Sequence, residues 1–328
     1  MREQVHRIEI SAKTIVFAVV LLILLQVIWV VRELFYSFVI AFIVMSAFNP
    51  AVSWLARARV PRALSAVFLF GLLISAITYL FMWLVPPVSK ETAVLVKNLP
   101  KYLSTFNLGP QFQPNENLIS QYVSSVTGGT FDFLKSAFSN VIFLISTIFF
   151  SFYFLLEERS IKAFFVRFMD KKNAPIAAVI IDKMEMRMQS WLWGQLILMM
   201  SIGITTYIGL ILLGVKYPLP LAVFAGLLEV VPIIGPIISA VPAFLVTASQ
   251  SWVGGFMVLG LYFVIQQVEN QVLVPVIMRR AVGLSPIITL AALIIGGKLA
   301  GIMGVLLAVP ITLGVETVLT ELSNLRKD

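Results

Sequence analysis

The sequence predicts an all-α protein that crosses a membrane several times. Hydrophobic residues make up 59% of its 328 residues and charged residues make up 12%, whereas soluble domains average about 45–50% and about 25%. Charge-free apolar runs recur along the chain, and most are long enough to cross roughly 30 Å of hydrocarbon. Because lipid cannot satisfy free backbone N–H and C=O groups, these runs are expected to be helical. We expect about six full spans, two re-entrant helical hairpins in an inverted repeat, and an amphipathic extracytoplasmic segment.

Three spans are predicted in the N-terminal region. The first covers about residues 14–31, and we interpret it as an uncleaved helix because no small-residue cleavage site follows it. The second covers about residues 34–55 and ends at a short basic loop. The third covers about residues 63–85, where Pro86 and Pro87 are expected to end the helix because proline disfavours helical geometry in the residue before it.

The middle of the chain is expected to leave the membrane twice. Residues 88–135 are more polar, and their apolar residues recur near helical spacing, which indicates amphipathic extracytoplasmic helices. A fourth span is predicted at about residues 136–156. The following segment, residues 157–189, carries seven Lys and Arg residues interleaved with Phe and Met. It is expected to be an amphipathic helix at the membrane surface, either packed on the protein's own spans or bound to anionic lipid.

The positive charges predict the orientation of the chain. The net charge is +8, but the Lys and Arg residues lie in tails and short loops beside the apolar runs. We interpret them as topology signals and expect no nucleic-acid partner. Both termini and the basic loops at residues 57–62 and 157–189 are expected to be cytoplasmic.

The composition argues against an enzyme, a metal site and a cofactor. The chain has no Cys, and its one His, His6, lies in the N-terminal tail. Disulfides, thiolate nucleophiles and most metal sites are therefore excluded. Since no Asp lies in a predicted span, we also expect no intramembrane hydrolase.

A span followed by a broken apolar stretch occurs twice in the C-terminal half. A span at about residues 191–214 precedes the stretch 218–242, and a span at about residues 252–274 precedes the stretch 286–310. In each stretch 24 positions separate the first proline from the last, and each closes on Ala-Val-Pro. The charge pattern predicts that the first stretch enters and leaves on the outer side and the second on the cytoplasmic side. Such inverted repeats are typical of secondary transporters, although two ordinary spans are the alternative.

Helix-breaking residues lie inside both stretches. Proline removes a backbone donor and clashes with the preceding turn, and glycine tolerates unusual dihedral angles. The predicted breaks are Pro232, Gly235 and Pro236 in the first stretch, and Gly296, Gly297 and Gly301 in the second. Broken backbone inside a membrane must be covered by protein or line a watery cavity, so these breaks indicate a transport site. The chain thus divides into an N-terminal three-span region (1–87), an extracytoplasmic segment (88–135), span four with a basic connector (136–190) and a transport core (191–328).

Two ionisable residues are expected near the membrane centre. Glu229 and Lys298 lie close to the midpoints of the two broken stretches. An ionisable side chain at that depth is costly and indicates a functional site. The two residues either form a structural ion pair or line a cavity that contacts a polar solute or a proton.

A second polar group closes the 252–274 span. Gln266, Glu269 and Asn270 fall on one face of that helix, toward the hairpins. Gln195 and the pair Thr205-Thr206 on the preceding span would complete a cavity lined by amides and hydroxyls. The alternative is interhelical hydrogen bonding, which is common in membranes.

Four motifs together resemble the autoinducer-2 exporter family of bacterial membrane proteins. Residues 229–236 read EVVPIIGP, residues 269–275 read ENQVLVP, and residues 282–286 read VGLSP. The last motif, residues 296–310, begins GGKLAG and ends AVP. The similarity covers nearly the whole chain. Two departures are Ile233, where the family often has an aromatic residue, and Ser285, where it often has His.

The resemblance implies a transporter of the bacterial cytoplasmic (inner) membrane. Some members are linked to export of the quorum-sensing signal autoinducer-2, and others to exchange of sodium or lithium for protons. A passive channel or a structural membrane scaffold is the alternative from another class. We expect a small polar solute, a proton or sodium ion, membrane lipid and further copies of the chain as partners. The candidate coupling-ion residues are Glu229 and Glu269, and the candidate solute contacts are Gln195, Gln266, Asn270 and Lys298.

Overall fold

The structure is a computed structural model that describes residues 31–104, 141–157, 162–163, 174–232, 234–278 and 284–324, with isolated residues between 13 and 27. Half of the first predicted span, most of the expected extracytoplasmic segment and the pair Arg279-Arg280 lie outside the described residues. Regular secondary structure is helical throughout the described ranges, which confirms the predicted all-α class.

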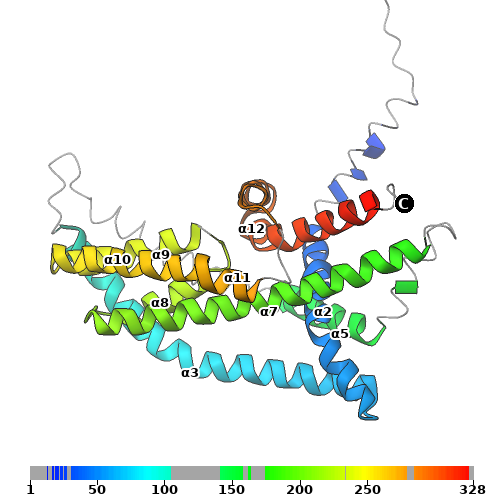
Figure 1. Ribbon diagram of the computed structural model, residues 1–328, viewed down its shortest axis with the longest axis horizontal. Helices are drawn as coiled ribbons and strands as arrows, with labels where there is room; N and C mark the ends of the chain where they lie inside the picture. Colours follow the sequence, from blue (N-terminus) through cyan, green and yellow to red (C-terminus); the bar gives the residue numbers. More distant parts are fainter. Residues whose placement is uncertain are drawn as a thin grey trace, which may run out of the picture.

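Among the described residues, five helical segments are long and apolar enough to cross a membrane. They correspond to α2, α3, α7, the continuous run from α10 to α11, and α12, whereas α5, α8 and α9 are shorter apolar helices. The multi-span architecture predicted from the composition is therefore confirmed. In chain order the helices are α2 (Arg32–Arg57), α3 (Arg62–Ser104), α5 (Val141–Leu156), α7 (Ala174–Leu212), α8 (Pro218–Leu228), α9 (Ile234–Ala248), α10 (Trp252–Val268), the π-helix η2 (Glu269–Leu273), α11 (Val274–Ile277) and α12 (Pro286–Asn324) (Figure 1).

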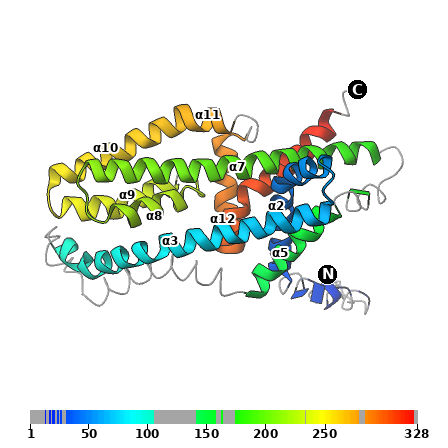
Figure 2. The same ribbon diagram turned by 90° about the horizontal axis from the view of Figure 1, so that it is seen from below.

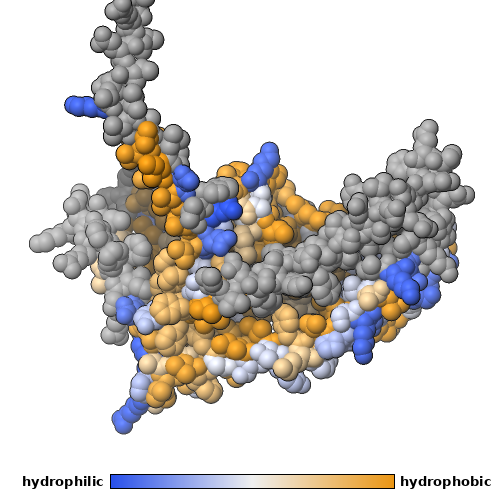
Figure 3. All heavy atoms as spheres, turned by 180° about the vertical axis from the view of Figure 1, so that it is seen from behind, coloured by the Kyte–Doolittle hydropathy of each residue, from blue (hydrophilic) through white to orange (hydrophobic). Residues whose placement is uncertain are grey.

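Large apolar side chains cover the outside of the long helices. Tyr79 and Met82 on α3 are 72% and 73% exposed, and Leu212 at the end of α7 is 80% exposed. Figure 3 shows hydrophobic residues spread over much of the coloured surface of one face. Soluble monomers rarely expose contiguous apolar patches larger than a few hundred Å², so this surface fits contact with lipid.

Helix α3 continues through Pro86 and Pro87, so the expected helix end at these residues is wrong. The Ser89 hydroxyl donates a hydrogen bond to the Pro86 carbonyl at 2.9 Å. Two prolines remove two backbone donors, but the helix continues because its later turns pack against other helices. Leu95 is buried in the core between α7 and α10, and Asn98 Nδ2 donates to the Tyr217 hydroxyl at 3.2 Å. Figure 1 shows that α3 bends along its course toward these helices.

Helix α7 joins the basic connector to the fifth span in one run of 39 residues. Its basic side chains pair with acidic groups of the protein itself: Lys183 Nζ lies 2.7 Å from Glu321 Oε1, and Arg187 Nη2 lies 2.5 Å from Glu316 Oε2. Arg187 also donates to the Thr317 hydroxyl at 2.9 Å. This part of the connector therefore packs on α12, in agreement with the first of the two interpretations of its charge.

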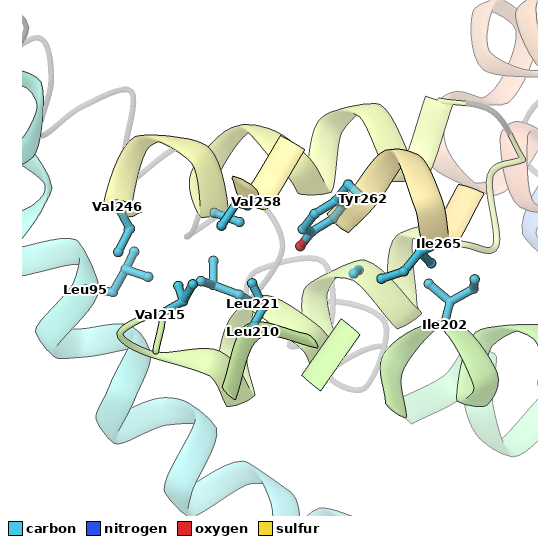
Figure 4. Packing of buried hydrophobic residues seen from close by; sticks show 11 residues of the cluster. Leu95, Ile202, Leu210, Val215, Leu221, Val246, Val258, Tyr262 and Ile265 are labelled. Carbon is cyan, nitrogen blue, oxygen red and sulfur yellow. The ribbon is translucent and has the colours of Figure 1, made fainter. Parts of the chain in front are cut away.

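Helices α7, α8, α9 and α10 form a bundle in which α8 and α9 are the two arms of a hairpin (Figure 2). The chain reverses after α7 through Gly214 and Tyr217, which have φ angles of 64° and 60°. It runs back along α7 as α8 and returns as α9, which packs against α10. Figure 4 shows the apolar core of this bundle, to which α3 adds Leu95.

Helix α12 consists of two arms that meet at a sharp break. Ala300 and Gly301 have non-helical dihedral angles, and Gly301 has φ 58° and ψ −137°. The arms fold back on each other, since a Cβ on Gly304 would lie 1.9 Å from the carbonyl oxygen of Gly296. Both broken stretches of the sequence are therefore broken helices in the structure. Whether their ends face the same side of a membrane stays a prediction.

Candidate functional site

Glu229 lies at the tip of the α8–α9 hairpin and is only 2% exposed. It caps the C-terminus of α8, where its N–H donates to the Ala225 carbonyl at 3.1 Å. The helix ends here because Pro232 and Pro236 cannot donate the next backbone hydrogen bonds. The turn is tight enough that a Cβ on Gly235 would lie 2.0 Å from the Leu228 carbonyl oxygen. Proline and glycine thus place a carboxyl group inside the bundle.

Close packing of α8 on α7 sets the position of that carboxyl group. A Cβ on Gly226 would lie 2.8 Å from the Met199 carbonyl oxygen and 3.2 Å from the Gly203 Cα. One turn further along α7, the Gln195 amide nitrogen donates to the backbone carbonyl of Glu229 at 2.9 Å. Gln195 is 5% exposed, so this hydrogen bond is made where water does not compete. The Glu229 backbone is therefore fixed by α7, while its side chain points elsewhere.

Glu269 approaches the same place from α10 and is 4% exposed. It is the first residue of η2, the π-helical turn ahead of Pro275. Proline cannot make the α-helical hydrogen bond to the residue four positions earlier, and a π turn is often found at functional sites within helices. The Gln266 amide nitrogen donates to Glu269 Oε2 at 3.0 Å, which orients the carboxyl group.

The carboxyl groups of Glu229 and Glu269 are buried neighbours, close enough to interact electrostatically. The two carboxyl groups have different surroundings: Glu269 accepts a hydrogen bond from the Gln266 amide, whereas Glu229 Oε2 has no hydrogen-bond partner. Two ionised carboxylates in contact repel strongly where water is excluded. This arrangement can accept a proton or a cation between the two carboxyl groups.

Two predicted site residues are not brought to the carboxyl pair. Asn270 is exposed, although it directly follows the buried Glu269. Lys298 is exposed on α12, and α12 contacts α7 and α2 but not α8, α9 or α10. The ion pair considered between Glu229 and Lys298 is not formed. Of the candidate residues, the structure gathers Glu229, Glu269, Gln195 and Gln266.

The predicted glycine and proline breaks have different roles. Pro232, Gly235 and Pro236 lie at or beside the α8–α9 turn. In α12 only Gly301 is part of the break itself. Gly296 lies where the two arms cross, and a Cβ on Gly297 would lie 3.2 Å from the Val305 side chain.

Sequence reasoning did not identify Tyr262 as part of this interior. Tyr262 lies on α10, is 8% exposed, and its hydroxyl has no hydrogen-bond partner. The signal was present in the sequence, since Tyr262 precedes Glu269 by seven residues and so lies on the same side of a helix. Within the described residues, no group of three or more His, Cys, Asp or Glu side chains is placed to hold a metal ion.

Comparison with known proteins identifies the family. The family described as AI-2E family transporter matches residues 17–324. The chain belongs to the AI-2E family. It is 25% identical to "Putative transport protein YrrI" of Bacillus subtilis (strain 168), over 96% of this chain and 95% of the relative. It is 26% identical to "AI-2 transport protein TqsA" of Escherichia coli (strain K12), over 94% of this chain and 92% of the relative.

The AI-2E match confirms the resemblance stated from the four motifs. A further relative, "Putative transport protein YhhT" of Escherichia coli (strain K12), is 27% identical over 89% of this chain and 86% of its own length. The protein is therefore a multi-pass membrane protein of a transport family. The buried carboxyl pair lies in two of the motifs that carry the resemblance, EVVPIIGP and ENQVLVP.

Proposed function

We propose that this AI-2E family protein is a secondary transporter that exports a small polar solute across the bacterial cytoplasmic membrane. The observation that carries the proposal is that Glu229 and Glu269 are buried neighbours, one at the end of α8 and the other at the start of η2. Ionisable side chains inside membrane segments are rare and mark ion or proton pathways. Broken helices near the membrane centre form the binding sites of many secondary transporters.

The carboxyl pair would couple solute movement to a proton or a cation. With a proton or cation bound, the contact between Glu229 and Glu269 is favourable. Without one, the two negative charges repel, and the hairpin tip and η2 are driven apart. A state with the two elements apart would expose the carboxylates and the Gln266 amide to a polar solute. The energy for export would come from an ion or solute gradient.

Autoinducer-2 is the first solute to test, because the relative TqsA is named an AI-2 transport protein. Sodium/proton antiport is the second candidate function, since carboxylate and amide oxygens are the ligands that hard cations prefer. In that case Glu229 and Glu269 would bind sodium and protons in turn. A passive channel or a structural membrane scaffold would be indifferent to a proton gradient.

The test is efflux from proteoliposomes loaded with autoinducer-2, with and without an imposed pH gradient. We expect gradient-driven efflux by the native chain and its loss in Glu229→Gln and Glu269→Gln. Asp182→Asn is the matched control, because the Asp182 side chain is 64% exposed and lies outside the bundle site. Sodium-dependent proton movement without autoinducer-2 efflux would favour the antiporter. An autoinducer-2 efflux rate that is the same with and without the pH gradient in all variants would refute coupled transport.

We also propose that the hairpins are re-entrant, that both termini are cytoplasmic and that the protein assembles as a homo-oligomer. The α8–α9 hairpin supports re-entry, because its open end lies beside the end of α7 and the start of α10 (Figure 2). Surface tags at residues 214–217 and 249–251 should then be accessible from the same side of the membrane. Tags found on opposite sides would show two ordinary spans instead.

A further inference from the structure

Two hydroxyl groups are buried inside the α7–α10 bundle without a hydrogen-bond partner. Thr206 of α7 is 0% exposed and Tyr262 of α10 is 8% exposed. Neither Thr206 Oγ1 nor the Tyr262 phenol oxygen has a partner. Burying a hydroxyl without a hydrogen bond is costly. Each hydroxyl therefore needs a partner that the surrounding protein atoms do not supply.

Thr206 differs from other threonines on the helices of this protein. Thr205, Thr247 and Thr312 each donate a hydrogen bond to the carbonyl four residues earlier, at 2.7, 2.9 and 2.7 Å. This local bond is the usual way in which a helical threonine satisfies its hydroxyl. Thr206 makes no such bond to Ile202, so its hydroxyl is free to bind something else.

The two hydroxyls lie at the same level of the bundle. Gly209 packs so closely on α10 that a Cβ there would lie 2.5 Å from the Leu261 side chain. Thr206 lies one turn before Gly209 on the buried side of α7, and Tyr262 directly follows Leu261. In Figure 4 the Tyr262 hydroxyl points into the buried cluster, toward the side where Leu210 of α7 and Leu221 of α8 lie.

These hydroxyls lie between the carboxyl pair and the open end of the hairpin. Tyr262 precedes Glu269 by seven residues, which is about 10 Å along a helix, and Thr206 follows Gln195 by eleven, about 16 Å. Helices α8 and α9 and residues 191–212 of α7 contain no Asp, Lys, Arg or His. On α7 to α10 the titratable groups that face this interior are Glu229, Glu269 and Tyr262, whereas Tyr207 is 36% exposed. Helix α3, which packs on α8 and α9, adds Glu91, whose Oε2 is buried, and the exposed Lys90 and Lys97.

We propose that Thr206 and Tyr262 together bind a water molecule, and that this site lies on a hydrated proton path between the Glu229–Glu269 pair and the open end of the α8–α9 hairpin. A water needs at least two polar partners to be held inside a protein, and the two hydroxyls supply them. During transfer each hydroxyl accepts one proton and releases another, so no group on the path changes its charge. The water site stands on the geometry alone, whereas the proton path rests on the proposed function.

A double-mutant cycle of thermal stability tests the water site without any transport assay. Tyr262→Phe and Thr206→Val remove one hydroxyl each at nearly constant shape. If one water bridges both, each single variant lowers the melting temperature, and the double variant lowers it no further than the larger single effect. Tyr207→Phe and Thr205→Val, on the outward side of the same helix, are the controls. A higher or unchanged melting temperature in either single variant, or additive losses, would overturn the site.

Proton movement tests the path. Proteoliposomes with an enclosed pH-sensitive dye report the protons that accompany an autoinducer-2 gradient. We expect Tyr262→Phe and Thr206→Val to slow this signal several-fold and Thr206→Ser, which keeps the hydroxyl, to restore it. With equal autoinducer-2 concentrations inside and outside, autoinducer-2 exchanges without net proton movement. All three variants should retain this exchange, whereas a variant with a structural defect would lose it. Native-like proton movement in both hydroxyl-free variants would overturn the path.

The two proposals fail in different ways. If the native chain moves no protons with autoinducer-2, the proposed function is wrong, and the stability cycle still decides the water site. If Glu229→Gln abolishes gradient-driven efflux while Tyr262→Phe and Thr206→Val behave like the native chain in both assays, the proposed function stands and the water site and path are wrong.

Discussion

Replacing Gly304 with alanine tests whether the two arms of α12 fold back on each other as described. A Cβ on Gly304 would lie 1.9 Å from the Gly296 carbonyl oxygen, and a Cβ on Gly296 would lie 2.3 Å from the Gly304 carbonyl oxygen. Both contacts are with backbone, which cannot rotate away. The arms would have to separate by roughly 1.5 Å to reach an ordinary van der Waals distance, and the packing contacts around them would weaken.

The loss in the free energy of unfolding caused by Gly304→Ala can be isolated by comparison with alanine at a glycine that packs against nothing, Gly260. Forcing an extra methyl group into a packed interior costs about 1–3 kcal/mol, and alanine in a helix gains about 1 kcal/mol over glycine. Gly260 on α10 is exposed, and a Cβ there meets nothing within 4 Å. Gly260→Ala therefore gains the helix propensity of alanine without the packing cost. The two variants should differ by about 1–3 kcal/mol in the free energy of unfolding, or roughly 2–12 °C in melting temperature.

The assay is thermal unfolding of the purified protein in detergent, followed by its tryptophan fluorescence. We expect Gly304→Ala to melt below Gly260→Ala, with Gly296→Ala close to Gly304→Ala. Equal melting temperatures for Gly304→Ala and Gly260→Ala would show that the arms do not meet at these glycines. The fold-back of α12, and with it the second hairpin, would then be refuted.

Three further predictions concern single contacts. Arg187→Ala should lower the free energy of unfolding by about 1–2 kcal/mol at low salt, because it removes the ion pair with Glu316. In 1 M salt the loss should be smaller, since salt screens the two charges. Equal losses at both salt concentrations would contradict this. Gly301→Ala should cost about 1–3 kcal/mol in a denaturant titration, since φ 58° and ψ −137° suit glycine, and a neutral effect would show a different backbone there. Gln195→Leu should cost about 1–3 kcal/mol in melting experiments, because it leaves the buried Glu229 carbonyl without its 2.9 Å hydrogen bond; an unchanged melting temperature would show that this bond contributes nothing.

Proline and glycine predicted the helix break at Pro232 to Pro236 but not the continuity of α3 through Pro86 and Pro87. The turn at Pro232 to Pro236 was predicted correctly, because two prolines and a glycine act together over five residues. Pro86 and Pro87 lack that effect, since Leu95 and later turns of α3 pack on the bundle and keep the helix in place. A sequence shows the local cost of a proline but not the packing that offsets it.

The polar site was predicted in part, for a similar reason. Gln266 and Glu269 lie on one side of α10 as the α-helical period indicates, and they hydrogen-bond to each other. Asn270 does not join them and is exposed, because it lies about 100° around the helix from the buried Glu269. Lys298 was placed at the site on the symmetry of the two hairpins, but α12 packs on α7 and α2 and takes it elsewhere.

The way in which Glu229 is held bears on how the proposed coupling would work. Its backbone carbonyl is bound by Gln195 of α7, and α8 packs on α7 through Gly203 and Gly226. None of these contacts uses the Glu229 carboxyl group, so none depends on its protonation. The contact with Glu269 does depend on it. We therefore expect a proton to change only the fit between the hairpin tip and η2, with α7 and α8 moving as one unit against α10.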